Sequence, residues 1–226
     1  MNLRMASTRP SAVLFDLDGT LLDTAPDMIH ALNRICVEEG VAPVAFERGR
    51  AYVSNGVAGL LRLAFPAFDP LRDKALQDRY LAYYAGRLAV DTSRFPGIDE
   101  LLRSLDAASV PWGVVTNKPA RLTGPLLAAV GLDHRSACTV SGDTLPERKP
   151  HPRPILFALE HIGVPPGRAI YVGDALRDIE SGKAAGTSTI AARYGYVEPG
   201  QDPANWGADM IVDSPRELLA LVGQHG

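Results

Sequence analysis

Four polar segments of this 226-residue chain carry residue types that suit the chemistry of a phosphoryl group. They are Asp16-Leu17-Asp18-Gly19-Thr20, Thr116-Asn117-Lys118-Pro119, Arg148-Lys149-Pro150-His151-Pro152 and Gly173-Asp174. Asp16, Asp18 and Asp174 come just after apolar runs that are typical of buried strands. If those strands are neighbours in a parallel sheet, their carboxyl ends bring the three carboxylates together at one edge. The first expectation is therefore a shared acidic site.

This acidic group predicts a bound divalent cation. Three carboxylates without a counter-charge would repel one another, and at least one pKa would rise strongly. A cation removes the repulsion. An all-oxygen ligand set without His or Cys favours Mg²⁺, which also shares oxygens of a substrate phosphate. We therefore expect Mg²⁺ as the cofactor.

Donors for a phosphoryl group lie in the other two segments. Lys149 supplies a point charge, and the hydroxyl of Thr116 and nearby backbone N–H groups are neutral donors. An aspartate in line with the phosphorus can take the phosphoryl group covalently. A second carboxyl can protonate the leaving oxygen and later activate water. The pattern therefore indicates phosphoryl transfer through an aspartate.

Strand and helix patterns alternate along most of the chain. Apolar runs that predict buried strands span residues 12–15, 112–116, 169–173 and 188–192, with weaker runs at 138–140 and 210–212. Helical spacing of apolar residues separates them, over residues 98–108, 122–130, 154–162, 176–185 and 215–222. Alternating strands and helices favour an α/β fold with a parallel sheet and helices on both faces.

One stretch interrupts this alternation. Between Thr24 and Thr92 there is no strand-like run, and helical patterns cover residues 27–39, 56–64 and 71–88. We therefore expect a core built from residues 1–24 and 93–226, with residues 25–92 forming a helical insertion. The polar flanks at 23–26 and 91–94 are candidate hinges.

The set of motifs resembles the haloacid dehalogenase superfamily of phosphotransferases. DLDGT at 16–20, the strand-terminal Thr116, the pair Lys149-Pro150 and GDALRD at 173–178 occur in the order of that superfamily. The resemblance implies a Rossmann-like core, and it implies that the helical insertion is a cap of the C1 type. It also implies that Asp16 is the nucleophile and Asp18 the general acid and base. Asp16, Asp174 and the backbone carbonyl of Asp18 would hold Mg²⁺.

The same resemblance implies the roles of the remaining site residues. The phosphoryl group would be held by Thr116, Asn117 and Lys149. Asp178 would orient Lys149 or a metal-bound water. In capped members the segment around Asn55 faces the site, so Arg50 and Asn55 are candidate substrate contacts.

Within the superfamily, the closer resemblance is to the phosphoglycolate phosphatase group. It rests on FDLDGTLLDTAPD, VSNGVAGLL, GVVTNKP, RKPHP and ARYGYVEPG. This group hydrolyses 2-phosphoglycolate to glycolate and phosphate. The C-terminal segment RYGYVEPGQDPANWGADMIVDSP is similar to the N-acetylmuramic acid 6-phosphate phosphatases, so that substrate is kept as an alternative.

Other activities of the superfamily fit less well. The namesake dehalogenases lack an aspartate at the position of Asp18. Phosphonatases use a cap lysine, and the only lysine between Thr24 and Thr92 is Lys74, in a polar run. A β-phosphoglucomutase-type phosphomutase uses the same two aspartates and remains a second alternative.

Composition narrows the class of partner. The formal net charge is -3 and 22% of the residues are charged, which gives no reason to expect nucleic acid as a partner. No window approaches 18 uncharged apolar residues, so no membrane helix is expected. We expect a cytoplasmic enzyme, a monomer or a homodimer, that acts on a small phosphorylated metabolite.

Overall fold

The computed structural model describes residues 9–222, and the ends of the expected core at 1–8 and 223–226 lie outside the described residues. Six parallel strands form one sheet in the order β5–β4–β1–β6–β7–β8. The strands are β1 (Ala12–Phe15), β4 (Trp112–Val115), β5 (Thr139–Val140), β6 (Ala169–Gly173), β7 (Ser188–Ala192) and β8 (Met210–Val212). The predicted α/β fold with a parallel sheet is confirmed.

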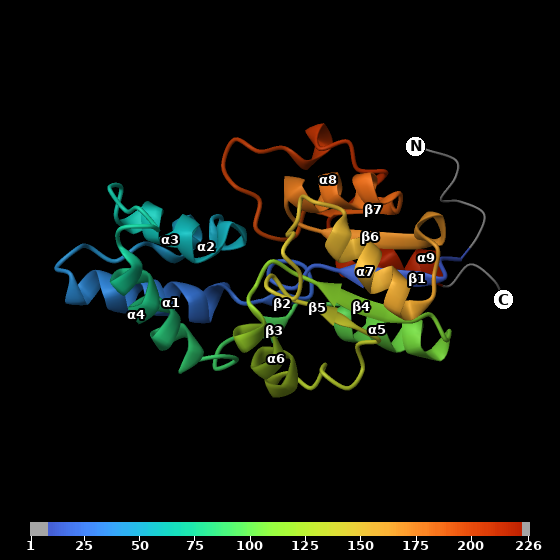
Figure 1. Cartoon of the computed structure of the whole chain (residues 1–226), viewed down its shortest axis with the longest axis horizontal. Coiled ribbons are helices and arrows are strands. Elements are labelled where there is room, and N and C mark those ends of the chain that lie inside the picture. The colour runs from blue at the N-terminus through green and yellow to red at the C-terminus, as the bar shows by residue number, and fades with distance from the viewer. Residues whose placement is uncertain (1–8, 223–226) are drawn as a thin grey trace.

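Helices cover both faces of this sheet (Figure 1). They are α5 (Ile98–Ala107), α6 (Ala120–Ala129), α7 (Arg153–Ile162), α8 (Leu176–Ala185) and α9 (Leu219–Val222). Alternate side chains of β1 pack on opposite faces of the sheet, because successive side chains of a strand point in opposite directions. Leu14 packs in one apolar cluster with Ile155 of α7. Phe15 packs in the other cluster with Leu101 of α5. The continuous apolar sequence of β1 is thus explained by burial on both sides.

The helical insertion follows the first strand and lies to one side of the sheet (Figure 1). Its helices are α1 (Ala25–Glu38), α2 (Phe46–Arg50), α3 (Gly56–Ala64) and α4 (Lys74–Ala85), with a 3₁₀ turn, η1 (Val53–Asn55), before α3. Helix α1 has Pro26 in its first turn, where the missing N–H leaves no bond unmade. Helices α1 and α4 pack against each other along the insertion.

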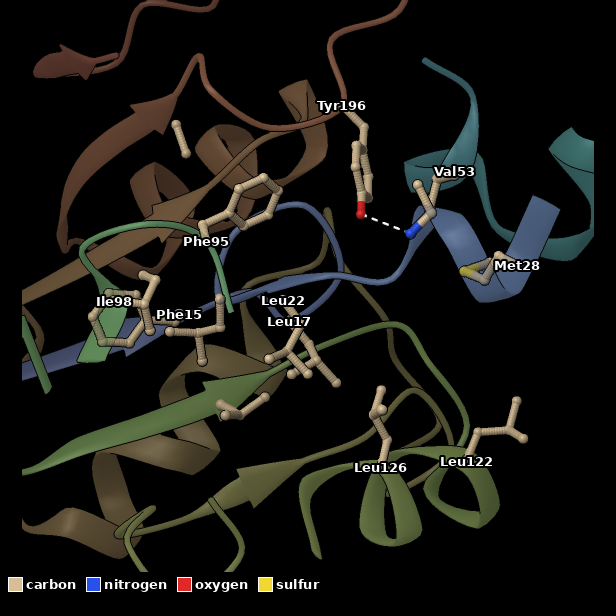
Figure 2. Packing of buried hydrophobic residues seen from close by; sticks show 14 of the residues in the cluster. Phe15, Leu17, Leu22, Met28, Val53, Phe95, Ile98, Leu122, Leu126 and Tyr196 are labelled. Carbon is tan, nitrogen blue, oxygen red and sulfur yellow. Dashed lines mark hydrogen bonds between the residues drawn. The ribbon is translucent and has the colours of Figure 1, made fainter. Parts of the chain in front are cut away.

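The two crossings between sheet and insertion lie side by side. Strand β2 (Leu22–Asp23) leads into the insertion and β3 (Ser93–Arg94) leads out, and the two strands pair in antiparallel fashion. At this point the hydroxyl of Tyr196 accepts a hydrogen bond from the N–H of Ala25 and donates one to Asp23. Figure 2 shows Tyr196 directed from the segment after β7 toward the start of the insertion, beside Met28 and Val53.

Some predicted elements differ from the observed ones. The residues predicted as polar hinges include Asp23 of β2 and both residues of its partner β3, and these paired strands are too short to show a period. Helix α2 was not predicted. The helix expected over 215–222 is divided into a 3₁₀ turn, η4 (Pro215–Leu218), and α9. Ser214 caps η4 by accepting a hydrogen bond from the N–H of Arg216. Short 3₁₀ turns of this kind are frequent at the N-termini of α-helices.

None of the helices within residues 9–222 combines the length and the apolar character that crossing a lipid bilayer requires.

Candidate active site

The carboxyl ends of β1 and β6 bring three buried carboxylates together. Asp16 follows β1, Asp174 follows β6, and Asp178 lies in the first turn of α8. One oxygen of each lies within 4.8 Å of the others. The Nζ of Lys149 is 2.8 Å from Oδ1 of Asp16 and 2.8 Å from Oδ1 of Asp178. The sheet therefore assembles an acidic group with one buried ammonium against it.

The charges of this group shift its pKa values in different directions. Burial alone would raise the pKa of Asp16, but the positive charges of Lys149 and Arg177 hold it below the usual value of a carboxyl. Burial, and then the negative charges of Asp16 and Asp178, raise the pKa of Asp174 to about 7. Burial also raises the pKa of Asp178, although Lys149 opposes that shift. The side chain best suited to stay charged is therefore Asp16.

The same group fits a divalent cation. Oδ1 of Asp16 and Oδ1 of Asp178 are buried, and within residues 9–222 neither accepts a hydrogen bond of good geometry, despite the ion pairs with Lys149. Such oxygens have lone pairs free for a metal ion. All three donors are carboxylate oxygens, which suits a hard cation. The structure thus supports a metal site of this chemical type.

Asp18 lies outside this group and has partners of its own. Nζ of Lys118 is 2.9 Å from Oδ1 and 3.1 Å from Oδ2 of Asp18. The hydroxyl of Thr24 donates to Oδ1 at 2.7 Å. Lys118 also donates to the hydroxyl of Tyr84 at 2.7 Å. The carboxylate of Asp18 is therefore held by contacts separate from those of the acidic group.

Thr116 and Asn117, the two residues after β4 that were expected to hold the phosphoryl group, have different contacts. Thr116 is buried, lines the cavity described below, and accepts a hydrogen bond from the N–H of Lys118 at 3.2 Å. Asn117 pairs its amide group with the main chain of Lys149, donating to the carbonyl and accepting from the N–H. That amide therefore orients the segment that carries Lys149, and Asn117 also lines the cavity described below.

A cavity of about 780 Å³ lies between the helical insertion and the sheet. On the sheet side Asp16, Asp18 and Thr116 line it, and on the insertion side Ser54, Asn55 and Tyr84 do. Arg62 and Arg148 also line it, and both are exposed. A ligand of the volume of a drug-sized molecule can be accommodated beside the acidic group.

The insertion reaches the acidic group directly. The hydroxyl of Ser54 donates to Oδ2 of Asp174 at 2.7 Å, and Arg177 donates to the carbonyl of Ser54 at 2.7 Å. Arg50 donates to the carbonyl of Gly195 at 3.2 Å. Asn55 donates to Glu198 at 3.0 Å. Of the two candidate substrate contacts, Asn55 lines the cavity, whereas Arg50 binds the segment after β7.

Two basic residues of the site were not singled out from the sequence. Lys118 follows Thr116-Asn117 in the segment TNKP, and Arg177 precedes Asp178 in GDALRD. Their positions inside these motifs could have identified them as site residues, since a basic residue in a segment that lines an acidic site is a potential counter-ion. A surface lysine or arginine looks the same in sequence, so only the fold distinguishes them.

The family follows from comparison with known proteins. The family model of the haloacid dehalogenase-like hydrolases matches residues 13–192, a range that contains Asp16, Asp18, Asp174 and Asp178. The chain belongs to this family. The site geometry agrees with the match, because the matched range begins within β1, includes β6 and ends with β7, and Asp16 and Asp174 directly follow β1 and β6.

Named relatives cover nearly the whole chain. An N-acetylmuramic acid 6-phosphate phosphatase of Pseudomonas aeruginosa is 45% identical over 224 residues, covering 96% of this chain and 97% of the relative. A phosphoglycolate phosphatase of Xanthomonas campestris pv. campestris is 42% identical over 209 residues, covering 92% and 95%. Both are named as hydrolases of phosphoric monoesters. The expected reaction class, a phosphatase of this family, is thereby confirmed.

Solved structures agree with this fold. A protein of Haemophilus somnus 129PT, described as a predicted phosphoglycolate phosphatase, has a TM-score of 0.84 at 28% identity and covers 95% of this chain and 98% of its own. The Rossmann-like core with helices is therefore shared with phosphatases of the family.

Proposed function

We propose that this chain hydrolyses phosphate monoesters through a phospho-aspartate on Asp16. The observation that carries the proposal is the state of Asp16, a buried carboxylate that Lys149 and Arg177 keep charged at the wall of the cavity. A charged carboxylate held rigidly beside a positive group is a competent nucleophile for phosphorus. In the first step a bond forms between an Asp16 oxygen and phosphorus, and the bond from phosphorus to the leaving oxygen breaks.

Asp18 is proposed as the general acid and base. It lines the same cavity and lies two residues beyond the nucleophile, on the turn that follows β1. It would give a proton to the leaving oxygen in the first step. In the second step it would take a proton from the water that attacks the phospho-aspartate. Thr116 and Lys149 would hold the oxygens of the phosphoryl group.

We propose Mg²⁺ as the cation of the acidic group. Asp16 and Asp174 would hold it with the backbone carbonyl of Asp18, and Asp178 would orient Lys149. The buried Oδ1 of Asp16, which accepts no well-directed hydrogen bond within residues 9–222, and the carboxylate oxygen of Asp174 within 4.8 Å of an Asp16 oxygen support this proposal. When bound, the ion would offset the negative charge of the phosphoryl group and of the carboxylates.

Residues 25–92 are proposed to act as a cap on a core of residues 1–24 and 93–226. The cavity between insertion and sheet supports this division. A cap excludes bulk water from a small phosphorylated metabolite and opens to release the product. We further propose that the enzyme works in the cytoplasm, as a monomer or a homodimer.

For the substrate, we propose 2-phosphoglycolate first, in keeping with the relatives named as phosphoglycolate phosphatases. A second candidate is N-acetylmuramic acid 6-phosphate, in keeping with the relative from Pseudomonas aeruginosa. The cavity of about 780 Å³ has room for this larger ester.

The test is phosphate release with Mg²⁺ from both esters at matched concentrations. A preference of about tenfold in kcat/KM corresponds to about 1.4 kcal/mol of transition-state binding and decides between the substrates. Activity that a chelator leaves unchanged would refute the proposed cation. A β-phosphoglucomutase-type activity would instead appear as isomerisation of glucose 1-phosphate without release of phosphate.

A further inference from the structure

The side chain of Asp18 is held by the residue that precedes the helical insertion and, through Lys118, by a residue near the end of the insertion's last helix. Thr24, which donates to Oδ1 of Asp18 at 2.7 Å, directly precedes α1. Tyr84 lies near the end of α4 and contacts Asp18 through Lys118. A movement of α1 and α4 relative to the sheet would therefore change both sets of contacts at once.

The ammonium of Lys118 directs its N–H donors to two partners, Asp18 and Tyr84. It approaches both carboxylate oxygens of Asp18, at 2.9 and 3.1 Å, and the hydroxyl oxygen of Tyr84 at 2.7 Å. An ammonium has three N–H donors, so these contacts can use all of them. Lys118 is only 8% exposed and Tyr84 only 1%, so water competes weakly for these bonds. The geometry fixes the ammonium in one place.

Tyr84 is suited to accept this bond and remain neutral. Burial, and then the negative charge of Asp18, raise the pKa of Tyr84 well above its usual value. The centre of its ring also lies 4.6 Å from Nζ of Lys118, a distance at which the ring face attracts a cation. The insertion therefore contributes both a hydroxyl and an aromatic surface to hold Lys118.

We propose that Lys118 is a positioning residue for Asp18, and that Tyr84 of the helical insertion holds Lys118 in the place where it does this. The proposal rests on the proposed function, in which Asp18 protonates the leaving oxygen. It makes the insertion part of the chemistry, because Asp18 is aligned for proton transfer when α4 brings Tyr84 to Lys118.

The leaving group provides the test. An alkyl ester of phosphate needs a proton on its leaving oxygen, whereas 4-nitrophenyl phosphate has an acidic leaving group and needs little help. A variant that misplaces Asp18 should lose more activity on the alkyl ester. For Tyr84→Phe we expect kcat/KM on the preferred alkyl ester to fall about tenfold and kcat/KM on 4-nitrophenyl phosphate to fall less than about threefold, because kcat/KM reports the step in which the leaving oxygen departs and not the later attack of water on the phospho-aspartate.

Two further variants extend this comparison. Lys118→Met should show the same pattern with a larger loss on the alkyl ester, about 30-fold or more. Lys118→Arg keeps the positive charge and should recover part of that loss. Asp18→Asn gives the reference pattern for complete loss of the proton donor.

Tyr80→Phe is the matched control. Tyr80 is on the same helix, is fully buried, and donates its hydroxyl to the carbonyl of Met28 at 3.1 Å without lining the cavity. The Tyr80→Phe variant therefore loses one buried hydrogen bond, as Tyr84→Phe does. Equal losses of kcat/KM on the two esters in the Tyr84 and Lys118 variants would overturn the proposal. So would the same alkyl-specific loss in Tyr80→Phe. Absence of phosphate release by the wild-type chain would instead refute the proposed function.

Discussion

Lys149 and Asp16 form a buried ion pair, with 2.8 Å between Nζ and Oδ1 and with each residue 3% exposed. The amide of Asn117 holds the main chain of Lys149, and the hydroxyl of Tyr171 accepts a hydrogen bond from its ammonium at 2.8 Å. The position of this cation is therefore set by three neighbouring segments. Together with Arg177, Lys149 keeps the proposed nucleophile charged.

Replacing Lys149 by Met should reduce both activity and stability. Loss of the cation leaves Asp16 and Asp178 as buried carboxylates without their ion pair, which typically costs about 3–5 kcal/mol. The loss of a positive group at the phosphoryl site should reduce kcat by about 100-fold or more. Urea unfolding in EDTA measures the first effect, and Mg²⁺ should restore part of it. Lys74→Met, at an exposed position of α4, is the control and should change neither quantity.

Asp16→Asn should remove turnover while leaving the chain folded. The amide is nearly isosteric with the carboxylate but is a poor nucleophile, so no phospho-enzyme can form. Acid quenching of the wild-type enzyme during turnover should trap an alkali-labile phosphoryl group on the protein, and the variant should trap none. Trapped phosphate in Asp16→Asn, at the wild-type level, would show that another residue is the nucleophile.

Stability without metal should depend on pH through Asp174. Its pKa in the folded chain is about 7, above the usual 3.8, so the folded state holds a proton that the unfolded chain releases. The resulting stabilisation is complete below about pH 4 and is lost as the pH rises through 7. The raised pKa of Asp178 acts in the same direction, whereas the lowered pKa of Asp16 acts oppositely, and only at more acidic pH.

Thermal unfolding in EDTA checks this dependence. The Tm should be lower at pH 8 than at pH 5, by several degrees, and Mg²⁺ should raise it more at pH 8 because protons no longer compete for the carboxylates. Asp174→Asn should flatten the dependence, which separates this residue from the rest of the chain. A Tm in EDTA that rises equally from pH 5 to pH 8 in both proteins would contradict the expectation.

The arginines of the cavity should favour a leaving group that carries a carboxylate. Arg62 of α3 and Arg148, before Lys149, line the cavity, and neither forms an ion pair within residues 9–222. Arg62→Ala should raise KM for the preferred acidic ester by about fivefold to tenfold, corresponding to about 1 kcal/mol, with kcat little changed. A neutral alkyl phosphate should not respond. Arg72→Ala, at an exposed residue paired with Asp69, is the control.

Much of the core was predictable because its signals are local. The strand of residues 12–15 is recognisable as an unbroken apolar run, since both of its faces are buried. Helix α7 ends just before Gly163, which adopts the left-handed conformation with φ of 77° that glycine favours. The paired strands β2 and β3 had no such signal. Two residue pairs, Leu22 with Arg94 and Asp23 with Ser93, form there because the two crossings of the chain are brought side by side.

The individual site residues differ in how far sequence could identify them. Asp16 and Asp174 were predicted to meet, and they do, because both follow neighbouring parallel strands. Asp178 was assigned a supporting role, and the fold brings it into the same acidic group. Lys118 and Tyr84 gave no separate signal, since a lysine after a motif and a tyrosine at helical spacing are common in any protein.

By itself, the sequence determined where the strands lie along the chain, and thereby which carboxylates follow them. These properties depend on neighbours along the chain: apolar runs, glycines that end helices, and acids that directly follow strands. Only the tertiary structure decided which basic group faces which acid, Lys149 against Asp16 and Lys118 against Asp18. It also decided that Tyr84 of the insertion contacts Lys118. Such pairings join distant segments through the packing of sheet and insertion, and no periodicity within either segment encodes them.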